Sequence, residues 1–234
     1  MKGLLRLRRN LASLISRKLI PKKFFIISDD CWGGQLYRQL HIEYLTPTVG
    51  LWIHPKDYLN YIEFIKTSGK GNLDFVQSDK DYPVANLEGI EIHFKHYKNE
   101  DQAKEKYYRR LGRIQKDKLL VKIDFGKPEY TKLDIKRWNK MQLQNSVAFY
   151  PSDPEFQTRH IHNGVMIPDW VSDGSEMFDI TRKHFNVFQW IRTGKINSSG
   201  LHKIMNVLLF DPRAPKRITH NAMKSIRRKS RAPR

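Results

Sequence analysis

The chain has 234 residues, of which 39% are hydrophobic and 12% aromatic, so it can bury a sizeable core and is not globally disordered. Its single cysteine excludes a framework of intrachain disulfides and fits a reducing compartment. The net charge of +19 is concentrated at the two ends: residues 1–23 and 211–234 each carry +8, whereas residues 24–210 hold 26 basic and 23 acidic residues. The charge therefore indicates two basic arms and not a basic groove, which argues against nucleic acid as the main partner.

The first 23 residues have the pattern of an amphipathic helix. Apolar residues recur at a spacing of three to four: Leu4, Leu7, Leu11, Leu14 and Ile15. Such a stripe with basic residues opposite it is typical of a helix that lies on an anionic membrane, and the alternative is packing on the protein's own core. No apolar run is long enough to span a membrane and no secretory cleavage site is evident. We therefore expect a cytoplasmic protein, peripheral on the inner membrane.

The middle of the chain alternates between strand and helix patterns. Runs of apolar residues of strand type predict strands at 24–28, 49–53, 73–77, 90–94, 119–124, 146–149 and 165–167. Helical patterns, some with good capping residues, predict helices at 33–40, 55–66, 99–114, 132–141, 175–183 and 187–192. This alternation predicts an α/β fold: a three-layer domain over residues 24–194 with a mainly parallel, Rossmann-like sheet. Residues 1–23 and 195–234 would be amphipathic, basic terminal arms.

The turn after the first predicted strand holds the only cysteine. The strand ends in the pair Asp29-Asp30, and Cys31 precedes a helix that starts with Trp32-Gly33-Gly34. Ligands of open α/β sheets usually bind at this edge, and the positive end of a helix favours a thiolate. We therefore expect Cys31 to be a nucleophile, with the backbone amides of this turn facing a developing oxyanion. A buried, inert cysteine beside a structural tryptophan is the alternative.

The predicted strand at 90–94 supplies the other candidate reactive groups. Glu91 and His93 share one face of the strand because side chains alternate, and His96 follows shortly after it. A carboxylate beside a histidine can orient the ring and raise its basicity. If this strand reaches the edge that carries Cys31, His93 or His96 would be the base and Glu91 the orienting group. Otherwise both histidines are structural.

The predicted helix at 99–114 carries a basic stripe. Lys106, Arg109 and Arg113 share one face at spacings of three and four residues. The stripe could bind phosphates or the carboxylates of an acidic glycan, or it could be a solvated surface. The pair Asp29-Asp30 is a further candidate for substrate binding. Zinc-ligand spacing, a P-loop, a dinucleotide fingerprint and a Gly-x-Ser-x-Gly elbow are all absent from the sequence, and we expect chemistry without a metal.

Several motifs of this chain resemble those of one bacterial family. They are Ile26-Ile27-Ser28, Cys31-Trp32-Gly33-Gly34, residues 46–51, 55–58, 82–84 and 90–97, and the helix with Ala103, Lys106, Arg109, Arg110 and Arg113. In this order they resemble the DUF1919 family, over residues 24 to 194. The chain departs from the family pattern at Asp29-Asp30, where the family has Asn-Asn, at Lys122–Gly126, where it has an acidic-Gly segment, and in the basic C-terminal tail. The resemblance implies a capsule or exopolysaccharide context but no particular reaction.

These observations lead to one functional hypothesis and two alternatives. We expect an enzyme of capsule or exopolysaccharide biosynthesis that transfers an acetyl group from acetyl-CoA to a glycan through Cys31 and a histidine. The first alternative is a glycosyltransferase-like enzyme in which Asp29 and Asp30 hold a sugar nucleotide and a metal. The second is a non-catalytic scaffold or nucleic-acid-binding protein held by its basic arms.

Overall fold

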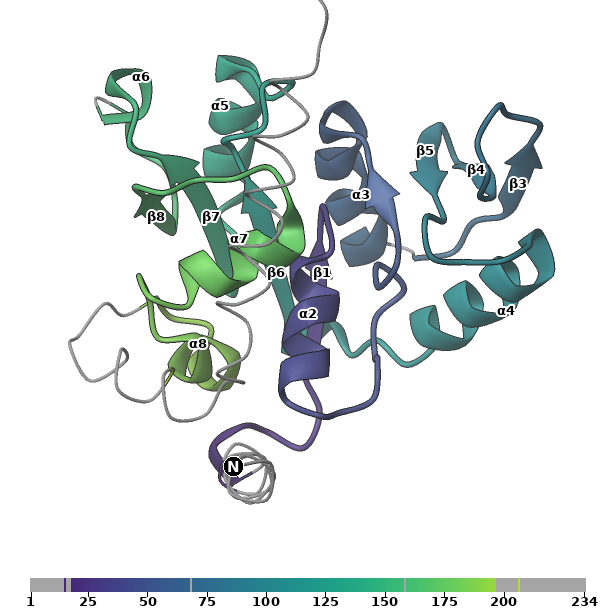
Figure 1. Cartoon of the computed structure of the whole chain (residues 1–234), viewed down its shortest axis with the longest axis horizontal. Helices are drawn as coiled ribbons and strands as arrows, with labels where there is room; N and C mark the ends of the chain where they lie inside the picture. The colour runs from purple at the N-terminus through teal and green to yellow at the C-terminus, as the bar shows by residue number, and fades with distance from the viewer. Residues whose placement is uncertain (1–14, 16–17, 68, 158, 197–205, 207–234) are drawn as a thin grey trace, which may run out of the picture.

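A four-stranded parallel sheet forms the centre of the fold (Figure 1). The computed structural model describes residues 15, 18–67, 69–157, 159–196 and 206. In the order of the sheet, the strands are β1 (Phe25–Ser28), β6 (Leu119–Asp124), β7 (Ser146–Pro151) and β8 (Gly164–Ile167). Because all three pairings are parallel, the carboxyl ends of the four strands meet at one edge of the sheet.

A second four-stranded sheet is antiparallel. In the order of that sheet, its strands are β2 (Trp52–Ile53), β5 (Ile90–His93), β4 (Val84–Leu87) and β3 (Leu73–Val76). The hairpin between β4 and β5 is closed by Glu88 and Gly89, whose φ angles are +51° and +84°. Two consecutive positive φ angles are typical of a type I′ turn, whose twist matches that of the flanking strands.

Seven α-helices are assigned within the described residues from β1 onwards. They are α2 (Trp32–Gln39), α3 (Pro55–Thr67), α4 (Glu100–Leu111), α5 (Lys132–Met141), α6 (Pro154–Gln157), α7 (Gly174–Thr181) and α8 (Val187–Thr193), with a short 3-10 helix, η1 (Lys116–Lys118), before β6. Asn99 is the N-cap of α4, and its side-chain oxygen accepts a hydrogen bond from the Gln102 amide at 2.9 Å. Asp173 caps α7 in the same way, through the amides of Ser175 and Glu176.

Successive side chains of β1 belong to two different apolar clusters. Phe25 and Ile27 pack in a cluster with residues of α3, α4, α5 and the antiparallel sheet. Ile26 and the preceding Phe24 pack in a second cluster with residues of α2, α7 and α8. Since successive side chains of a strand point to opposite faces, both faces of the parallel sheet are covered. This burial explains why its strands read as nearly continuous apolar runs.

The structure confirms a mixed α/β fold with a mainly parallel sheet, but it divides the strands differently from the sequence prediction. The segments predicted at 49–53, 73–77 and 90–94 belong to the antiparallel sheet and not to one common parallel sheet. Strand β4 was not predicted, because it is short and its Glu-Gly turn lacks the usual Asn-Gly or Asp-Gly signal. The Rossmann-like, three-layer arrangement and the domain boundaries stay predictions.

Most of the two basic arms lies outside the described residues. Ile15 is the described member of the predicted N-terminal stripe, and its side chain is 48% exposed. The C-terminal arm predicted at residues 195–234 also lies outside the described residues, apart from residues 195 and 196 and Asn206. None of the described helices has both the length and the apolar character that crossing a membrane requires.

Trp32 ties the start of α2 into the second apolar cluster. The side chain is fully buried, and its ring centroid lies 5.2 Å from that of Phe178 and 6.0 Å from that of Trp190. Its indole Nε1–H donates to Oγ1 of Thr181 at 2.8 Å. Trp32 therefore joins the turn after β1 to α7 and α8, and it packs as a structural residue.

We expect Trp32→Phe to lower the free energy of unfolding by about 1–3 kcal/mol, because the change removes the hydrogen bond to Thr181 and leaves a cavity. Denaturant unfolding followed by circular dichroism measures this loss. Leu133→Ala is the control, because Leu133 is 72% exposed and its truncation should change stability little. An unfolding free energy of Trp32→Phe equal to that of the wild type would contradict the structural role.

Candidate functional site

The turn after β1 is closed by its own side chains. The Ser28 hydroxyl donates to the Asp30 carbonyl at 2.7 Å and accepts from the Gly33 amide at 3.2 Å. The Trp32 amide donates to Oδ1 of Asp30 at 2.9 Å. A Cβ on Gly33 would come within 2.9 Å of the Ser28 hydroxyl, so the close packing of this turn requires glycine. Cys31 is thereby held at the N-cap position of α2, beyond the carboxyl end of β1.

The turn places the thiol against a histidine. Sγ of Cys31 lies 3.6 Å from Nε2 of His96. Cys31 is partly buried and His96 is exposed, so the pair is open to solvent on the histidine side. A thiol in contact with an imidazole can pass its proton to the ring, which is the arrangement that activates a cysteine nucleophile. The structure thus selects His96, of the two predicted histidines, as the partner of Cys31.

Gly50 allows the segment with His96 to approach the thiol. Its carbonyl accepts from the His96 amide at 3.2 Å, and its φ angle is +82°, in the region that favours glycine. A Cβ on Gly50 would lie 3.0 Å from the ring of Tyr97 and 3.3 Å from Cβ of His96. A larger residue would therefore be strained and would also push against the segment that carries the histidine.

The thiol at rest favours its neutral form. Burial raises the pKa of Cys31 above its ordinary value, and the charges of Asp30 and Asp173 raise it further, while Lys95 and Lys127 act in the opposite direction. This direction runs against the prediction of a thiolate at the helix N-terminus, because burial and two nearby carboxylates disfavour the charged form. A reactive Cys31 consequently needs a base at the moment of attack, and His96 is in place to serve as one.

His93 and Glu91 form a separate pair. Nε2 of His93 lies 2.7 Å from Oε1 of Glu91, and the His93 ring packs against Trp52 with their centroids 4.7 Å apart. Nδ1 of His93 is buried, with no hydrogen-bond partner among the described residues. Glu91 therefore orients His93 and not the histidine at the thiol, so the predicted arrangement of Cys31, histidine and orienting Glu91 does not assemble around His96.

The predicted oxyanion donors are already occupied. The Trp32 amide is hydrogen-bonded to Asp30 and the Gly33 amide to Ser28, so neither faces a reacting carbonyl. That prediction is wrong because a turn this tight uses its own amides to satisfy the neighbouring carboxylate and hydroxyl. Gly34 packs close to Val49, since a Cβ on it would lie 3.4 Å from the Val49 side chain.

Behind the thiol lies a buried cluster of charged side chains. Nζ of Lys122 donates to Asp29 at 2.9 Å and to Asp30 at 2.7 Å. Nζ of Lys127 lies 2.5 Å from Asp29 and 3.3 Å from Asp30. These lysines hold the pKa of Asp30 well below its usual value despite its burial. Asp29 and Asp30, predicted to bind substrate, are instead committed to internal ion pairs.

Neither lysine of this cluster was among the predicted site residues. Lys122 lies within the apolar run of β6 and is fully buried there, opposite Ser28 in the register of β1 and β6. A lysine inside a strand buried on both faces needs a carboxylate partner, and that signal could have linked it to Asp29 and Asp30.

Asp124 extends the cluster at the end of β6. Its Oδ1 accepts from the Gly126 amide at 3.0 Å and from Nε1–H of Trp170 at 2.7 Å. Its Oδ2 is buried and has no hydrogen-bond partner within the described part of the chain. Burial raises the pKa of Asp124 to about 6, and the lysines oppose this rise only in part.

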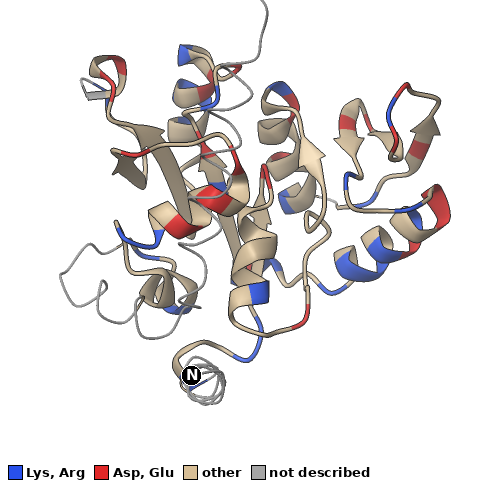
Figure 2. Ribbon diagram, in the orientation of Figure 1, with Lys and Arg blue, Asp and Glu red and all other residues tan. Residues whose placement is uncertain are grey.

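The predicted basic stripe lies along α4, where Figure 2 shows basic residues gathered. Arg109 pairs with Glu105 at 2.7 Å, and Arg113 pairs with Glu43. Nζ of Lys106 lies 5.7 Å from the centroid of the Tyr97 ring, next to His96 in the sequence. The charges of the stripe are thus partly neutralised by neighbouring carboxylates. Its Lys106 side chain contacts the segment that carries His96.

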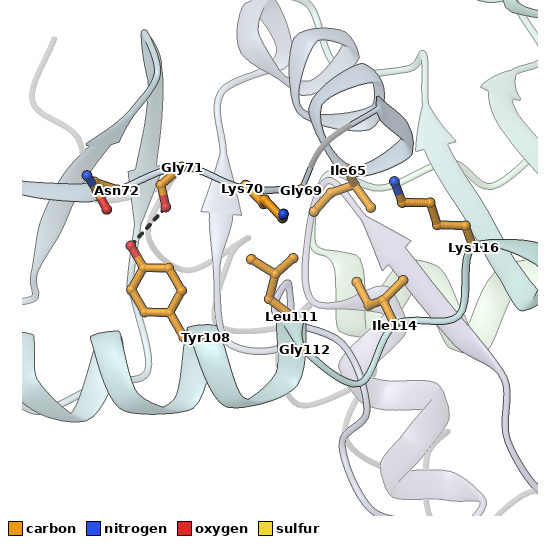
Figure 3. Close-up of a pocket in the computed structure, with 10 residues that line it drawn as sticks. All are labelled: Ile65, Gly69, Lys70, Gly71, Asn72, Tyr108, Leu111, Gly112, Ile114 and Lys116. Carbon is orange, nitrogen blue, oxygen red and sulfur yellow. Dashed lines mark hydrogen bonds between the residues drawn. The ribbon is translucent and has the colours of Figure 1, made fainter.

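A cavity of about 540 Å³ lies at the carboxyl ends of α3 and α4 (Figure 3). Its lining comprises Ile65, Gly69, Lys70, Gly71, Asn72, Tyr108, Leu111, Gly112, Ile114 and Lys116. The cavity borders η1, which precedes the amino end of β6, whereas Cys31 follows the carboxyl end of β1. It is therefore separate from the Cys31–His96 pair. In the ranges that the structure describes, no three His, Cys, Asp or Glu side chains gather as a metal site would require.

Comparisons with known proteins give a family without an assigned activity. The model of the family described as "Domain of unknown function (DUF1919)" matches residues 4–192. An uncharacterized protein from Haemophilus influenzae is 30% identical over 180 residues, which cover 76% of this chain and 87% of that protein.

We expect Asp124→Asn to flatten the pH dependence of stability between about pH 4 and pH 6. The pKa of Asp124 is higher in the folded state, at about 6, than its ordinary value of 3.8, so the folded state binds the proton more tightly. Its contribution to stability is complete below pH 3.8 and is lost as the pH rises through about 6, by about 3 kcal/mol at most. Urea unfolding from pH 4 to pH 7 measures the slope. Asp117→Asn, at an exposed carboxylate, is the control, and an unchanged slope in Asp124→Asn would refute the assignment.

Proposed function

This chain belongs to the DUF1919 family, and we propose that it is an acyltransferase in which Cys31 is the nucleophile and His96 the general base. The observation that supports the proposal is the 3.6 Å contact between Sγ of Cys31 and Nε2 of His96, beyond the carboxyl end of a parallel strand. Ligands of α/β sheets usually bind at this edge, and a thiol paired with an imidazole is suited to covalent acyl transfer.

In the proposed reaction, the acyl donor is a thioester. His96 takes the thiol proton as Sγ of Cys31 attacks the carbonyl carbon, and the donor's carbon–sulfur bond breaks. The imidazolium returns its proton to the departing thiolate, and the acyl group remains as a thioester on Cys31. An acceptor hydroxyl then attacks this thioester while His96 takes the hydroxyl proton. The new ester leaves and the proton returns to the Cys31 sulfur, so the enzyme is restored.

The raised pKa of the thiol fits this cycle. A thiol that is neutral at rest does not react until its proton is removed, so attack depends on His96. The Trp32 and Gly33 amides are engaged elsewhere. We propose that the exposed Lys95 takes their role: its Nζ lies 4.8 Å from the centroid of the Trp52 ring, and its charge lowers the pKa of the Cys31 thiol. If the side chain of Lys95 turns towards the bound acyl group, its charge would stabilise the negative oxygen that develops during attack.

We propose acetyl-CoA as the donor and a glycan hydroxyl as the acceptor, in capsule or exopolysaccharide biosynthesis. Lys106, Arg109 and Arg113 would contribute by attracting the phosphates of the donor or the carboxylates of an acidic glycan. The glycosyltransferase alternative receives less support, because the carboxylates of Asp29 and Asp30 are held by Lys122 and Lys127 and are not open to a metal or sugar nucleotide.

We also propose that the basic arms hold the protein at an anionic membrane surface on the cytoplasmic side. The support is the charge of +8 in residues 1–23 and again in residues 211–234. Each basic residue near an anionic surface adds about 1 kcal/mol of attraction, so arms of this charge would suffice for peripheral binding. An acceptor glycan assembled at the membrane would then be within reach of the site.

The first test of this proposal is covalent labelling of Cys31 by acetyl-CoA. Intact-protein mass spectrometry should show a mass increase of one acetyl group in the wild type and none in Cys31→Ser. His96→Ala should form the adduct about 10²-fold more slowly or worse, because it lacks the base. The release of free CoA provides an independent rate.

Two histidine variants complete this experiment. His160→Ala is the matched control, because His160 is exposed on a loop outside the site and should label like the wild type. If His93→Ala lost labelling while His96→Ala labelled normally, His93 and not His96 would be the general base. Equal labelling of Cys31→Ala and the wild type would overturn the cysteine mechanism.

The second test concerns the arms. The intact protein should sediment with vesicles that contain anionic lipid, and binding should weaken as salt rises. Deleting residues 1–14 should reduce binding, and Leu7→Ser with Leu11→Ser should reduce it without changing the charge. Vesicles of neutral lipid are the control. Binding to RNA but not to either kind of vesicle would contradict the membrane proposal and favour the nucleic-acid alternative.

A further inference from the structure

Arg110 of α4 is a buried cation beside the candidate site. Its side chain is 7% exposed, and its guanidinium carbon lies 5.5 Å from the centroid of the Tyr44 ring. Its helix neighbours Arg109 and Arg113 pair with Glu43, but none of the ion pairs among the described residues includes Arg110. Its Nε–H also has no hydrogen-bond partner within those residues. Within the described residues the buried guanidinium thus has no direct ion pair, although its charge acts at longer range on the Glu43 carboxylate, and its close polar partners are those of its hydrogen bonds.

These hydrogen bonds join two segments of the chain. Nη1 of Arg110 donates to the Val49 carbonyl at 3.2 Å and to the Tyr97 hydroxyl at 2.7 Å. The Tyr97 hydroxyl itself donates to the Val49 carbonyl at 2.8 Å. The guanidinium, the hydroxyl and the carbonyl therefore form a closed triangle that links α4 to both segments.

Both segments lead directly to His96. Tyr97 follows His96 in the chain, and Gly50, which follows Val49, accepts the hydrogen bond of the His96 amide at 3.2 Å. The Tyr97 ring also packs against Gly50, where a Cβ would lie 3.0 Å from it. The triangle thus lies one residue from His96 on one segment and one residue from Gly50, its hydrogen-bond partner, on the other, and it limits the movement of the backbone that carries the imidazole.

We infer that Arg110 is a positioning residue that keeps the imidazole of His96 within reach of the Cys31 thiol. The inference rests on the proposed role of the Cys31–His96 pair. A hydrogen bond between Tyr97 and Val49 alone would let the two segments move together relative to α4. The planar guanidinium, with donors in a rigid arrangement, fixes both to a third element. The hydrogen bonds to Val49 and Tyr97 offset part of the cost of burying a cation that has no direct ion pair.

The test uses alkylation of Cys31 by iodoacetamide, which needs no acyl donor and modifies the only cysteine of the chain. The rate is measured at several pH values in the wild type and in His96→Ala, Arg110→Met and Tyr97→Phe, together with the thermal midpoint of each. We expect Arg110→Met and Tyr97→Phe to slow alkylation near neutral pH several-fold. In a His96→Ala background neither change should slow it further, because Arg110 acts only through His96.

Lys104→Met is the matched control, since it removes one exposed positive charge from the same helix and should leave the rate unchanged. If Arg110→Met fails to fold, Tyr97→Phe, which loses a single hydroxyl, decides the question. The inference would be overturned if folded Arg110→Met and Tyr97→Phe were alkylated at the wild-type rate. It would also be overturned if these changes slowed alkylation equally in the presence and in the absence of His96. Either result would leave the proposed function intact. Wild-type alkylation in His96→Ala would instead show that the imidazole does not activate the thiol, and the proposed function would fail with it.

Discussion

The ion pairs between Lys122, Lys127 and the Asp29-Asp30 pair are the interaction on which the geometry of the site depends. They connect the carboxyl end of β1 to β6 and to the residues just beyond it, inside a region closed to solvent. Breaking a buried pair by removing one partner typically costs 3–5 kcal/mol, because it leaves an uncompensated charge. The turn that carries Cys31 is therefore held by electrostatics on one side and by the burial of Trp32 on the other.

The same cluster sets the chemistry of the thiol. The charge of Asp30 and the burial of the turn raise the pKa of Cys31, whereas Lys127, a member of the cluster, opposes that rise. The cluster thus supports the position of the sulfur and at the same time disfavours its charged form. A nucleophile in such surroundings depends on an adjacent base, which makes the contact with His96 the central feature of the proposed mechanism.

His96 reaches the thiol from a different part of the fold. It follows β5 of the antiparallel sheet, whereas Cys31 follows β1 of the parallel sheet, and 65 residues separate the two in the chain. The site therefore forms only where the turn after β1 meets the segment after β5, and its geometry depends on the loops that bring these two segments together. Gly50 and Tyr97 lie at this junction, and the hydrogen bonds of Arg110 tie it to α4.

The sequence by itself determined the α/β class, most of the helices and strands, and the turn with Cys31, because periodicity, capping residues and turn residues act over short distances. It also indicated that Cys31 belonged with a histidine of residues 90–96. Only the tertiary structure decided that the histidine is His96, that Glu91 serves His93, and that Asp29 and Asp30 are bound by Lys122 and Lys127. These outcomes depend on which strands pair and on which charges are buried together. Both are long-range properties, since β2 to β5 form a sheet of their own and the partners of Asp29 lie more than 90 residues away in the chain.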